Sequence, residues 1–239
     1  MNEVIVIASG KGGVGKTVFA ANMGAVLAQR DAKVLLLDMN MGLRNLDLCL
    51  GMESRVVYDV SDVLFGVCRL KQALIRDRRF TELYFMSAAQ GKESAKLDAG
   101  QVQSLYAKLR EMFDYIIVDA PTGIGHGLEL AAAGADRAVI IAIPEYASLR
   151  DADMVDRILT DYGIENRKYV VNKVKAELFG QGSFPSLEEM SEVLRMEMAG
   201  VIQYDENIHI AANNGVPIVY KQGTYVSDNF NHIVDRVLK

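Results

Sequence analysis

The sequence predicts a doubly wound α/β fold built on a mostly parallel sheet. Short apolar runs alternate along the chain with longer stretches of helical periodicity. Several runs are continuous rather than alternating, among them Val34–Leu37 and Ile116–Val118. Continuous apolar runs are typical of strands that a parallel sheet buries on both faces. The repeated order of strand and helix then indicates an open sheet with helices on both sides.

Each element is predicted from its own apolar pattern. We expect strands at 3–8, 33–38, 83–87, 114–119, 137–143, 168–172, 200–203 and 216–219. We expect helices at 16–30, 58–65, 101–112, 126–133, 148–162, 186–197 and 226–238. Ser186 and Glu189 have the spacing of a capping box, which predicts a helix start. The glycine-containing stretch 175–185 is predicted to be a mobile loop.

Composition limits the class of protein. The 239 residues, half of them apolar, are expected to form one domain spanning 1–239. No apolar run reaches the roughly 18–20 residues that span a bilayer, and the start lacks the basic region of a signal peptide. A net charge of −5 disfavours a surface that coats nucleic acid. Cys49 and Cys68 have no CxxC spacing, which indicates reduced thiols in a cytoplasmic protein.

The stretch that follows the first predicted strand reads GKGGVGKT and opens the first predicted helix. It satisfies G-x-x-x-x-G-K-[ST], a phosphate-binding loop in the strand-to-helix context that this motif requires. Lys16 is expected to reach the β- and γ-phosphates of ATP, or the β-phosphate of ADP, and the Thr17 hydroxyl is expected to bind Mg²⁺. The residues predicted to hold the nucleotide here are Gly10, Lys11, Gly12, Gly13, Val14, Gly15, Lys16, Thr17 and Val18.

Two aspartates end predicted strands. Asp38 closes Val34–Leu37, and Asp119 closes the strand at 114–119. Ligands of open α/β sheets bind beyond the carboxyl ends of the strands, and Mg²⁺ takes one or two carboxylates besides phosphate oxygens. An aspartate after a strand can also be a helix N-cap, but beside a phosphate-binding loop the metal site is favoured. Gly123, in the loop after Asp119, suits contact with the γ-phosphate.

The motifs together resemble the MinD/ParA family of deviant Walker A ATPases. The residues that carry the resemblance are the loop KGGVGKT with its extra lysine Lys11, the segment Asp38–Asp47 and Asp119–Ile124, and it runs from residue 3 to about 238. It implies a P-loop NTPase fold of this type and an ATP-dependent homodimer in which Lys11 reaches the partner subunit's nucleotide. It also implies a role in placing the division site or a related structure, with a regulatory partner of the MinC/MinE type. A solvated loop lysine is the alternative for Lys11.

Two further site residues follow from the resemblance. Asn40 stands where the family has an aspartate that orients the attacking water, so slow hydrolysis is expected; a neutral surface replacement without effect is the alternative. Asn172, followed by Lys173, matches the residue that reads the adenine edge, because an amide offers both a donor and an acceptor. The alternative for Asn172 is an ordinary turn residue at a strand end.

The predicted helix 226–238 is the last sequence feature that bears on location. Its apolar residues form a stripe that is more typical of a core-facing than of a membrane-facing helix; they are Phe230, Ile233, Val234, Val237 and Leu238. Family members continue into a basic amphipathic helix; either this protein lacks it or the chain was cut before it. We therefore expect weak membrane contact from this chain, with a cytoplasmic location that can be peripheral at the inner face of the cell membrane.

Three other functions are alternatives to this prediction. The flagellar-number ATPases share the GLxNLD stretch and remain an alternative. A ParA-type partitioning ATPase would need a basic face, and the acidic charge disfavours nucleic acid as a partner. A metabolic or redox P-loop enzyme, such as the iron protein of nitrogenase, would need two cysteines facing a shared cluster. Neither Cys49 nor Cys68 lies near the loop after Asp119.

Overall fold

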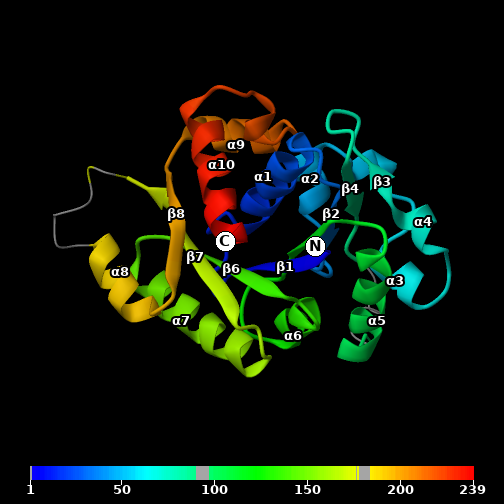
Figure 1. Cartoon of the computed structure of the whole chain (residues 1–239), viewed down its shortest axis with the longest axis horizontal. Coiled ribbons are helices and arrows are strands. Elements are labelled where there is room, and N and C mark those ends of the chain that lie inside the picture. Colours follow the sequence, from blue (N-terminus) through cyan, green and yellow to red (C-terminus); the bar gives the residue numbers. More distant parts are fainter. Residues whose placement is uncertain (1, 90–96, 176, 178–183) are drawn as a thin grey trace.

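The sheet is the organising element of the computed structural model, which describes residues 2–89, 97–175, 177 and 184–239. Its eight strands have the order β3-β4-β2-β5-β1-β6-β7-β8 (Figure 1). All neighbouring strands are parallel except the pair β3 and β4. The predicted doubly wound, mostly parallel sheet is therefore confirmed.

The strands match the predicted apolar runs closely. They are β1 (Glu3–Ala8), β2 (Val34–Asp38), β3 (Ile75–Arg76), β4 (Leu83–Met86), β5 (Tyr115–Asp119), β6 (Arg137–Ala142), β7 (Asn166–Val174) and β8 (Glu197–Gln203). Every residue of β2 and β6 is buried. This burial explains the continuous runs, because a strand covered on both faces has no position at which a polar side chain reaches water.

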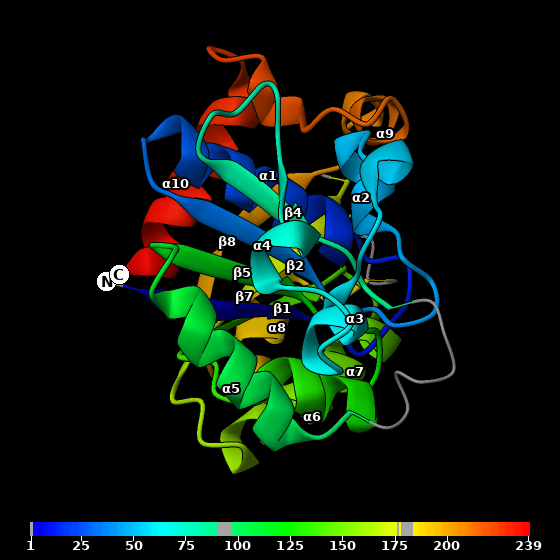
Figure 2. The same ribbon diagram turned by 90° about the vertical axis from the view of Figure 1, so that its right-hand side faces the viewer.

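Helices cover both faces of the sheet (Figure 2). The α-helices are α1 (Lys16–Gln29), α2 (Leu46–Leu50), α3 (Val60–Leu64), α4 (Leu70–Ala73), α5 (Ala99–Arg110), α6 (His126–Ala132), α7 (Tyr146–Asp161), α8 (Leu187–Leu194), α9 (Glu206–Asn213) and α10 (Tyr225–Leu238). Short 3₁₀ turns η1 (Glu53–Arg55) and η4 (Ile218–Tyr220) complete the described elements. α1 and α10 pack on the face that carries Ile5 and Ile7, and α5 to α8 on the face that carries Val4 and Val6.

The C-terminal helix faces the core, as predicted. The side chains of Phe230, Ile233, Val234 and Val237 are each at most 1% exposed, and α10 packs against β8 and α1. Within the ranges that the structure describes, no helix is both long and apolar enough to cross a bilayer.

Two sequence predictions were wrong in detail. The predicted strand 216–219 is instead the 3₁₀ turn η4, in which the Asn22 side chain accepts the N–H of Val219 at 3.2 Å and Gln29 donates to its carbonyl at 3.0 Å. These side chains of α1 take the hydrogen bonds that a sheet neighbour would have supplied. The predicted helix 186–197 ends at Leu194, because the following residues join the sheet as β8, with Glu197 opposite Lys168.

Several short elements were not predicted. α2, α4, β3 and α9 are each eight residues or fewer, and such lengths carry little periodic signal. Most of the predicted mobile loop 175–185 lies outside the described residues.

Candidate nucleotide site

The phosphate-binding loop joins β1 to α1 as the sequence predicts. Gly13 and Gly15 have φ angles of 76° and 94°, in the left-handed region that glycine adopts without strain. A Cβ on Gly15 would lie 2.3 Å from the Nδ2 atom of Asn172, so the close approach also requires glycine. No side chain caps α1 and no acidic residue occupies its first turn. The positive end of the helix therefore remains available to an anion.

Lys16, Thr17 and Asp119 meet beneath this loop. Lys16 Nζ lies 2.5 Å from Asp119 Oδ1, and the Thr17 hydroxyl donates to Asp119 Oδ2 at 2.7 Å. Lys16 is 5% exposed and Asp119 is fully buried. The sheet register explains the meeting, because Asp119 at the end of β5 lies beside Ile7 of β1, shortly before the loop begins.

Asp38 stands next to Asp119 on the adjacent strand β2. It is fully buried, and its carboxylate accepts the backbone N–H groups of Asn40 at 2.8 Å and Leu46 at 3.2 Å. Burial, and then the nearby charge of Asp119, raise the pKa of Asp38 to about 7. Two neighbouring buried carboxylates repel each other, so this position favours a cation.

The donor set fits magnesium held together with a nucleotide. Across the described residues there is no group of three or more His, Cys, Asp or Glu side chains that could hold a metal by themselves. Mg²⁺ does not require such a group, since it uses one or two carboxylates with phosphate oxygens and water. Asp38, Asp119 and the Thr17 hydroxyl place oxygen atoms at the mouth of the phosphate-binding loop. The buried Ser9 hydroxyl, which has no hydrogen-bond partner, adds a polar atom nearby.

The two remaining phosphate-side predictions, Asn40 and Gly123, lie on loops beside the carboxylates. Asn40 donates its backbone N–H to Asp38, and its carbonyl accepts from Leu43 and Arg44 at 3.3 Å each. Gly123, with a φ of 98°, donates its N–H to the Ser9 carbonyl at 2.9 Å. This hydrogen bond brings the loop after β5 against the beginning of the phosphate-binding loop.

The predicted base side lies across the same loop. Asn172 Nδ2 donates to the Val14 carbonyl at 2.7 Å, and Lys173 Nζ donates to the Gly13 carbonyl at 2.7 Å. Lys173 has a φ of 57°, uncommon for a residue with a side chain. A cavity of about 20 Å³ separates these residues from the segment after β8, and its lining comprises Gly15, Val18, Asn172, Lys173, Gln203, Tyr204, Asp205, Ile208 and His209.

A family model describes most of this chain. The CobQ/CobB/MinD/ParA nucleotide binding domain matches residues 5–218. The chain belongs to this family.

Individual relatives agree with the family match. The septum site-determining protein MinD of Bacillus subtilis is 38% identical over 240 residues, covering 100% of this chain and 90% of that protein. The MinD protein of Helicobacter pylori is 42% identical over 226 residues, covering 92% of this chain and 84% of that protein. The resemblance predicted from the sequence is thereby confirmed.

Solved structures also share the fold. MinD in the MinC:MinD cell division complex of Aquifex aeolicus superposes with a TM-score of 0.90 at 38% identity, covering 99% of this chain and 96% of that chain. MinD of Pyrococcus horikoshii, solved with Mg-ADP, has a TM-score of 0.88 at 27% identity and covers 100% and 97%. The predicted P-loop NTPase fold of the MinD/ParA type is confirmed.

Lys11, the extra lysine of this family's loop, has a partner within the chain. Its ammonium is hydrogen-bonded to the Glu145 carboxylate, and the two side chains are 35% and 43% exposed. Glu145 was not among the site residues predicted from the sequence. It follows β6, so the strand-end rule that located Asp38 and Asp119 could have found it.

Proposed function

We propose that this chain is an ATPase that works as a dimerising switch in placing the division site. Its MinD relatives are named septum site-determining proteins and align over nearly their whole length. The P. horikoshii relative was solved with Mg-ADP, which supports ATP or ADP and Mg²⁺ as ligands here. The observation that carries the proposal is the convergence of Lys16, Thr17, Asp38 and Asp119 at one mouth of the sheet.

The side chains of the site have distinct roles in this proposal. Bound Mg²⁺ neutralises charge that develops on the phosphates during transfer. Lys16 leaves Asp119 and binds the β- and γ-phosphates. Asp119 and Thr17 are then free to hold the metal, with Asp38 beside them. Asn40 orients the attacking water through its amide oxygen, which accepts a hydrogen bond but carries no charge.

The remaining proposed contacts lie around these groups. Backbone N–H groups of the loop from Gly10 to Val18 bind phosphate oxygens, and Gly123 approaches the γ-phosphate. Asn172 and Lys173 bind the base side. Lys11 exchanges its Glu145 partner for the nucleotide of a second copy of the chain, which makes dimerisation depend on ATP.

The wider assignments follow from the relatives and the fold. A regulatory partner of the MinC type is supported by the A. aeolicus complex, whose MinD subunit is 38% identical to this chain. We propose that residues 1–239 act as one domain, because strands from β1 to β8 join one sheet and α10 packs back onto it. Association with the inner face of the cell membrane stays a proposal, and nucleic acid is not expected as a partner.

Mass in solution tests the switch. Light scattering of the chain with ATP and Mg²⁺ is expected to show a heavier species than with ADP, because only the γ-phosphate distinguishes the two ligands. Lys11→Ala is expected to remove the ATP-dependent species, and Lys71→Ala, at an exposed lysine of α4, to leave it unchanged. A Lys11→Ala chain that dimerises as well as the parent would end the proposed role of Lys11 across the dimer.

A further inference from the structure

Helix α9 has an unusual position. Its residues Ile208 and His209 line the cavity beside Asn172, yet none of the helix residues from Glu206 to Asn213 is buried. Ile208 is partly buried against the core, so packing stabilises α9 less than it stabilises a fully buried helix. Contacts at the two ends of α9 therefore contribute to its position. At the first end, Asp205 accepts the N–H of Asn207 at 2.8 Å, and at the other end the chain turns through Gly215.

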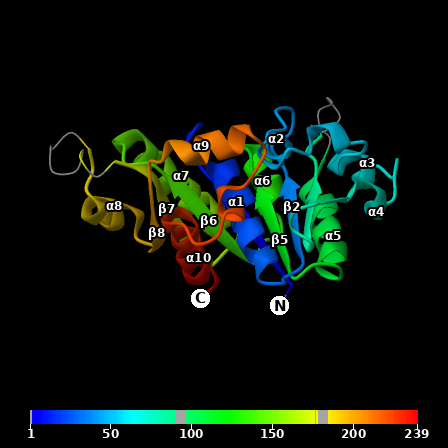
Figure 3. The ribbon, with the colours of Figure 1, turned by 90° about the horizontal axis from the view of Figure 1, so that it is seen from above.

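At Gly215 the end of α9 touches the end of α2. Gly51 and Gly215 both have left-handed φ angles, 60° and 66°. A Cβ on Gly215 would lie only 2.5 Å from the Gly51 Cα atom, so the two backbones are in direct contact. Figures 2 and 3 show α2 and α9 side by side.

The contact between α2 and α9 borders a cavity, because Gly51 and Gly215 are among the residues that line it. The cavity, of about 480 Å³, lies between the two helices, with Leu48 on the α2 side and His209 on the α9 side. Val18, the last residue of the predicted nucleotide-binding stretch, also lines it. The cavity therefore extends from the contact between the helix ends to the predicted nucleotide-binding stretch.

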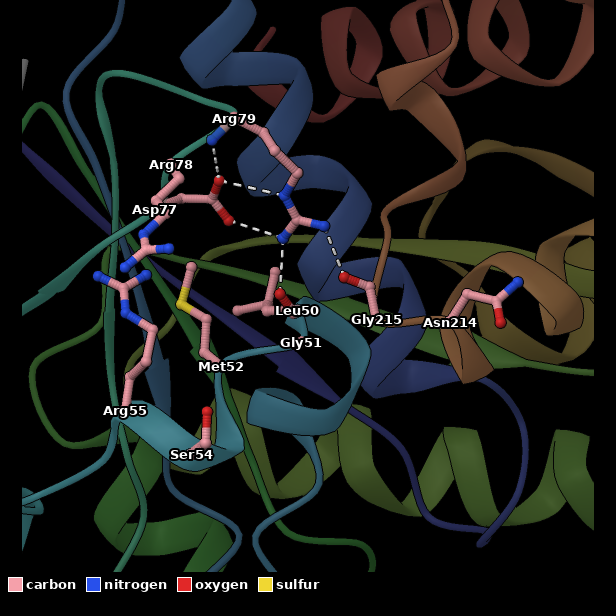
Figure 4. A pocket seen from close by; sticks show the side chains of 10 residues that line it. All are labelled: Leu50, Gly51, Met52, Ser54, Arg55, Asp77, Arg78, Arg79, Asn214 and Gly215. Atoms are coloured by element: carbon pink, nitrogen blue, oxygen red, sulfur yellow. Dashed lines mark hydrogen bonds and ion pairs between the residues drawn. The ribbon is translucent and has the colours of Figure 1, made fainter.

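Arg79 joins the C-terminal ends of α2 and α9 (Figure 4). One guanidinium nitrogen donates to the Gly215 carbonyl at 2.6 Å, and the other to the Leu50 carbonyl at 2.6 Å. Asp77, whose side chain is 1% exposed, fixes the guanidinium by accepting from Nε at 3.2 Å and from a terminal nitrogen at 2.8 Å. Only the planar fork of arginine can make these contacts together, since a lysine ammonium is a point donor.

The far end of α2 reaches the carboxylates. Its first residue, Leu46, donates its N–H to Asp38 Oδ2 at 3.2 Å, and Asp38 lies beside Asp119 in the sheet. Hydrogen bonds and backbone contacts thus run without a break from Asp38 through α2 and Arg79 to Gly215 and α9. The Asp38 end belongs to the phosphate side of the site, and the α9 end to the base side.

We propose that Arg79 is a positioning residue that couples the base side of the site to the phosphate side. The inference rests on the nucleotide site proposed above. Ile208 and His209 of α9 line the cavity beside Asn172, so a base seated there contacts α9 directly. Arg79 makes α2 and α9 move as one unit, and a ligand on the phosphates therefore biases the position of α9. By linkage, a bound base biases α2 and the Asp38 segment equally.

The test uses a ligand that has no base. Mg²⁺-tripolyphosphate is titrated into the full chain, and the imidazole NMR signal of His209, one of only three histidines, reports on α9. The His209 signal is expected to shift in the parent but not in Arg79→Lys, while both bind tripolyphosphate with similar affinity. ATP affinity of Arg79→Lys is expected to fall about tenfold, the usual size of a coupling between sites. Arg78→Lys, at the exposed neighbouring arginine, is the matched control and is expected to behave as the parent.

A second variant tests the contact between the backbones of Gly215 and Gly51. Gly215→Ala introduces the Cβ that meets Gly51, and it is expected to uncouple His209 as Arg79→Lys does. Gly223→Ala is its control, because Gly223 has a similar φ of 69° but nothing within 4 Å of the added Cβ. The coupling is overturned if the His209 signal of the parent does not shift with tripolyphosphate. It is also overturned if the shift persists in both Arg79→Lys and Gly215→Ala. A parent that binds neither Mg²⁺-ATP nor tripolyphosphate overturns the nucleotide site itself.

Discussion

The two sides of the proposed nucleotide site are held in place by different means. On the phosphate side, Lys16, Asp38 and Asp119 are at most 5% exposed, and the register of neighbouring strands sets the two aspartates. On the base side, α9 has no fully buried residue, and Ile208 is only partly buried against the core. Buried strands open only with the whole fold, whereas exposed helices with few buried contacts move at lower cost. The phosphate side is therefore rigid enough to hold its charged groups in fixed positions. The exposed helix α9 on the base side is able to adjust to the ligand.

Removing charge from the rigid side is expected to have the largest effect. Lys16→Ala deletes the ammonium proposed for the β- and γ-phosphates, and a charged hydrogen-bonding group of this kind contributes up to about 3 kcal/mol, or roughly 100-fold in affinity. Calorimetric titration with Mg²⁺-ATP measures the loss. Lys108→Ala, at an exposed position of α5, is expected to bind as the parent does. Equal ATP affinity in Lys16→Ala and the parent would contradict the role of the phosphate-binding loop.

Restoring a carboxylate at position 40 is expected to change hydrolysis more than binding. Ionised acceptors form hydrogen bonds roughly twice as strong as neutral ones, and each tenfold in rate needs only about 1.4 kcal/mol. Asn40→Asp is therefore expected to raise steady-state ATPase turnover about 10- to 100-fold and to shorten the lifetime of the ATP dimer. ATP affinity is expected to stay nearly unchanged. Turnover that is equal or lower would show that Asn40 does not orient the water.

The same contrast explains what the sequence predicted well. The strands β1, β2 and β5 and the phosphate-binding loop were predictable, because buried parallel strands leave continuous apolar runs and a nucleotide-binding loop needs fixed glycines. Asp38 and Asp119 could be placed together because the carboxyl ends of parallel strands share one edge.

The base side was less predictable for an equally physical reason. α9 is short, and its position depends on contacts between residues far apart in sequence, such as Arg79 with Gly215. No local sequence pattern predicts such a contact. The same holds for η4, where the side chains of Asn22 and Gln29 take the place of a strand neighbour.

A smaller effect is expected for base selectivity. Asn172→Ala removes the amide that is proposed to read the adenine edge, and one lost hydrogen bond is worth about 1 kcal/mol. The ratio of ATP to GTP affinity is expected to fall roughly fivefold. Competition against a fluorescent nucleotide measures this ratio. Asn166→Ala, at the opposite end of the same strand, is the control, and an unchanged ratio in Asn172→Ala would remove the base-reading role.

The smallest expected effect concerns stability and pH. Burial and the neighbouring Asp119 raise the pKa of Asp38 from 3.8 to about 7, so the folded state holds this proton more tightly than the unfolded state. The stability that the proton contributes is complete below about pH 4 and is lost as the pH rises through about 7.

Asp38→Asn removes this titration from the buried site that also holds Asp119 and Lys16. Without nucleotide or Mg²⁺, the variant is expected to lose less stability than the parent between pH 5 and pH 8, by ~1 kcal/mol or a few degrees in Tm. At pH 8 it should be the more stable of the two, because the parent carries two neighbouring buried carboxylates there. Thermal unfolding at both pH values measures the difference. Parallel pH profiles for parent and variant would mean that the charge of Lys16 offsets the charges of both aspartates. The two carboxylates would then not destabilise the folded chain, and Mg²⁺ would have no repulsion between them to reduce.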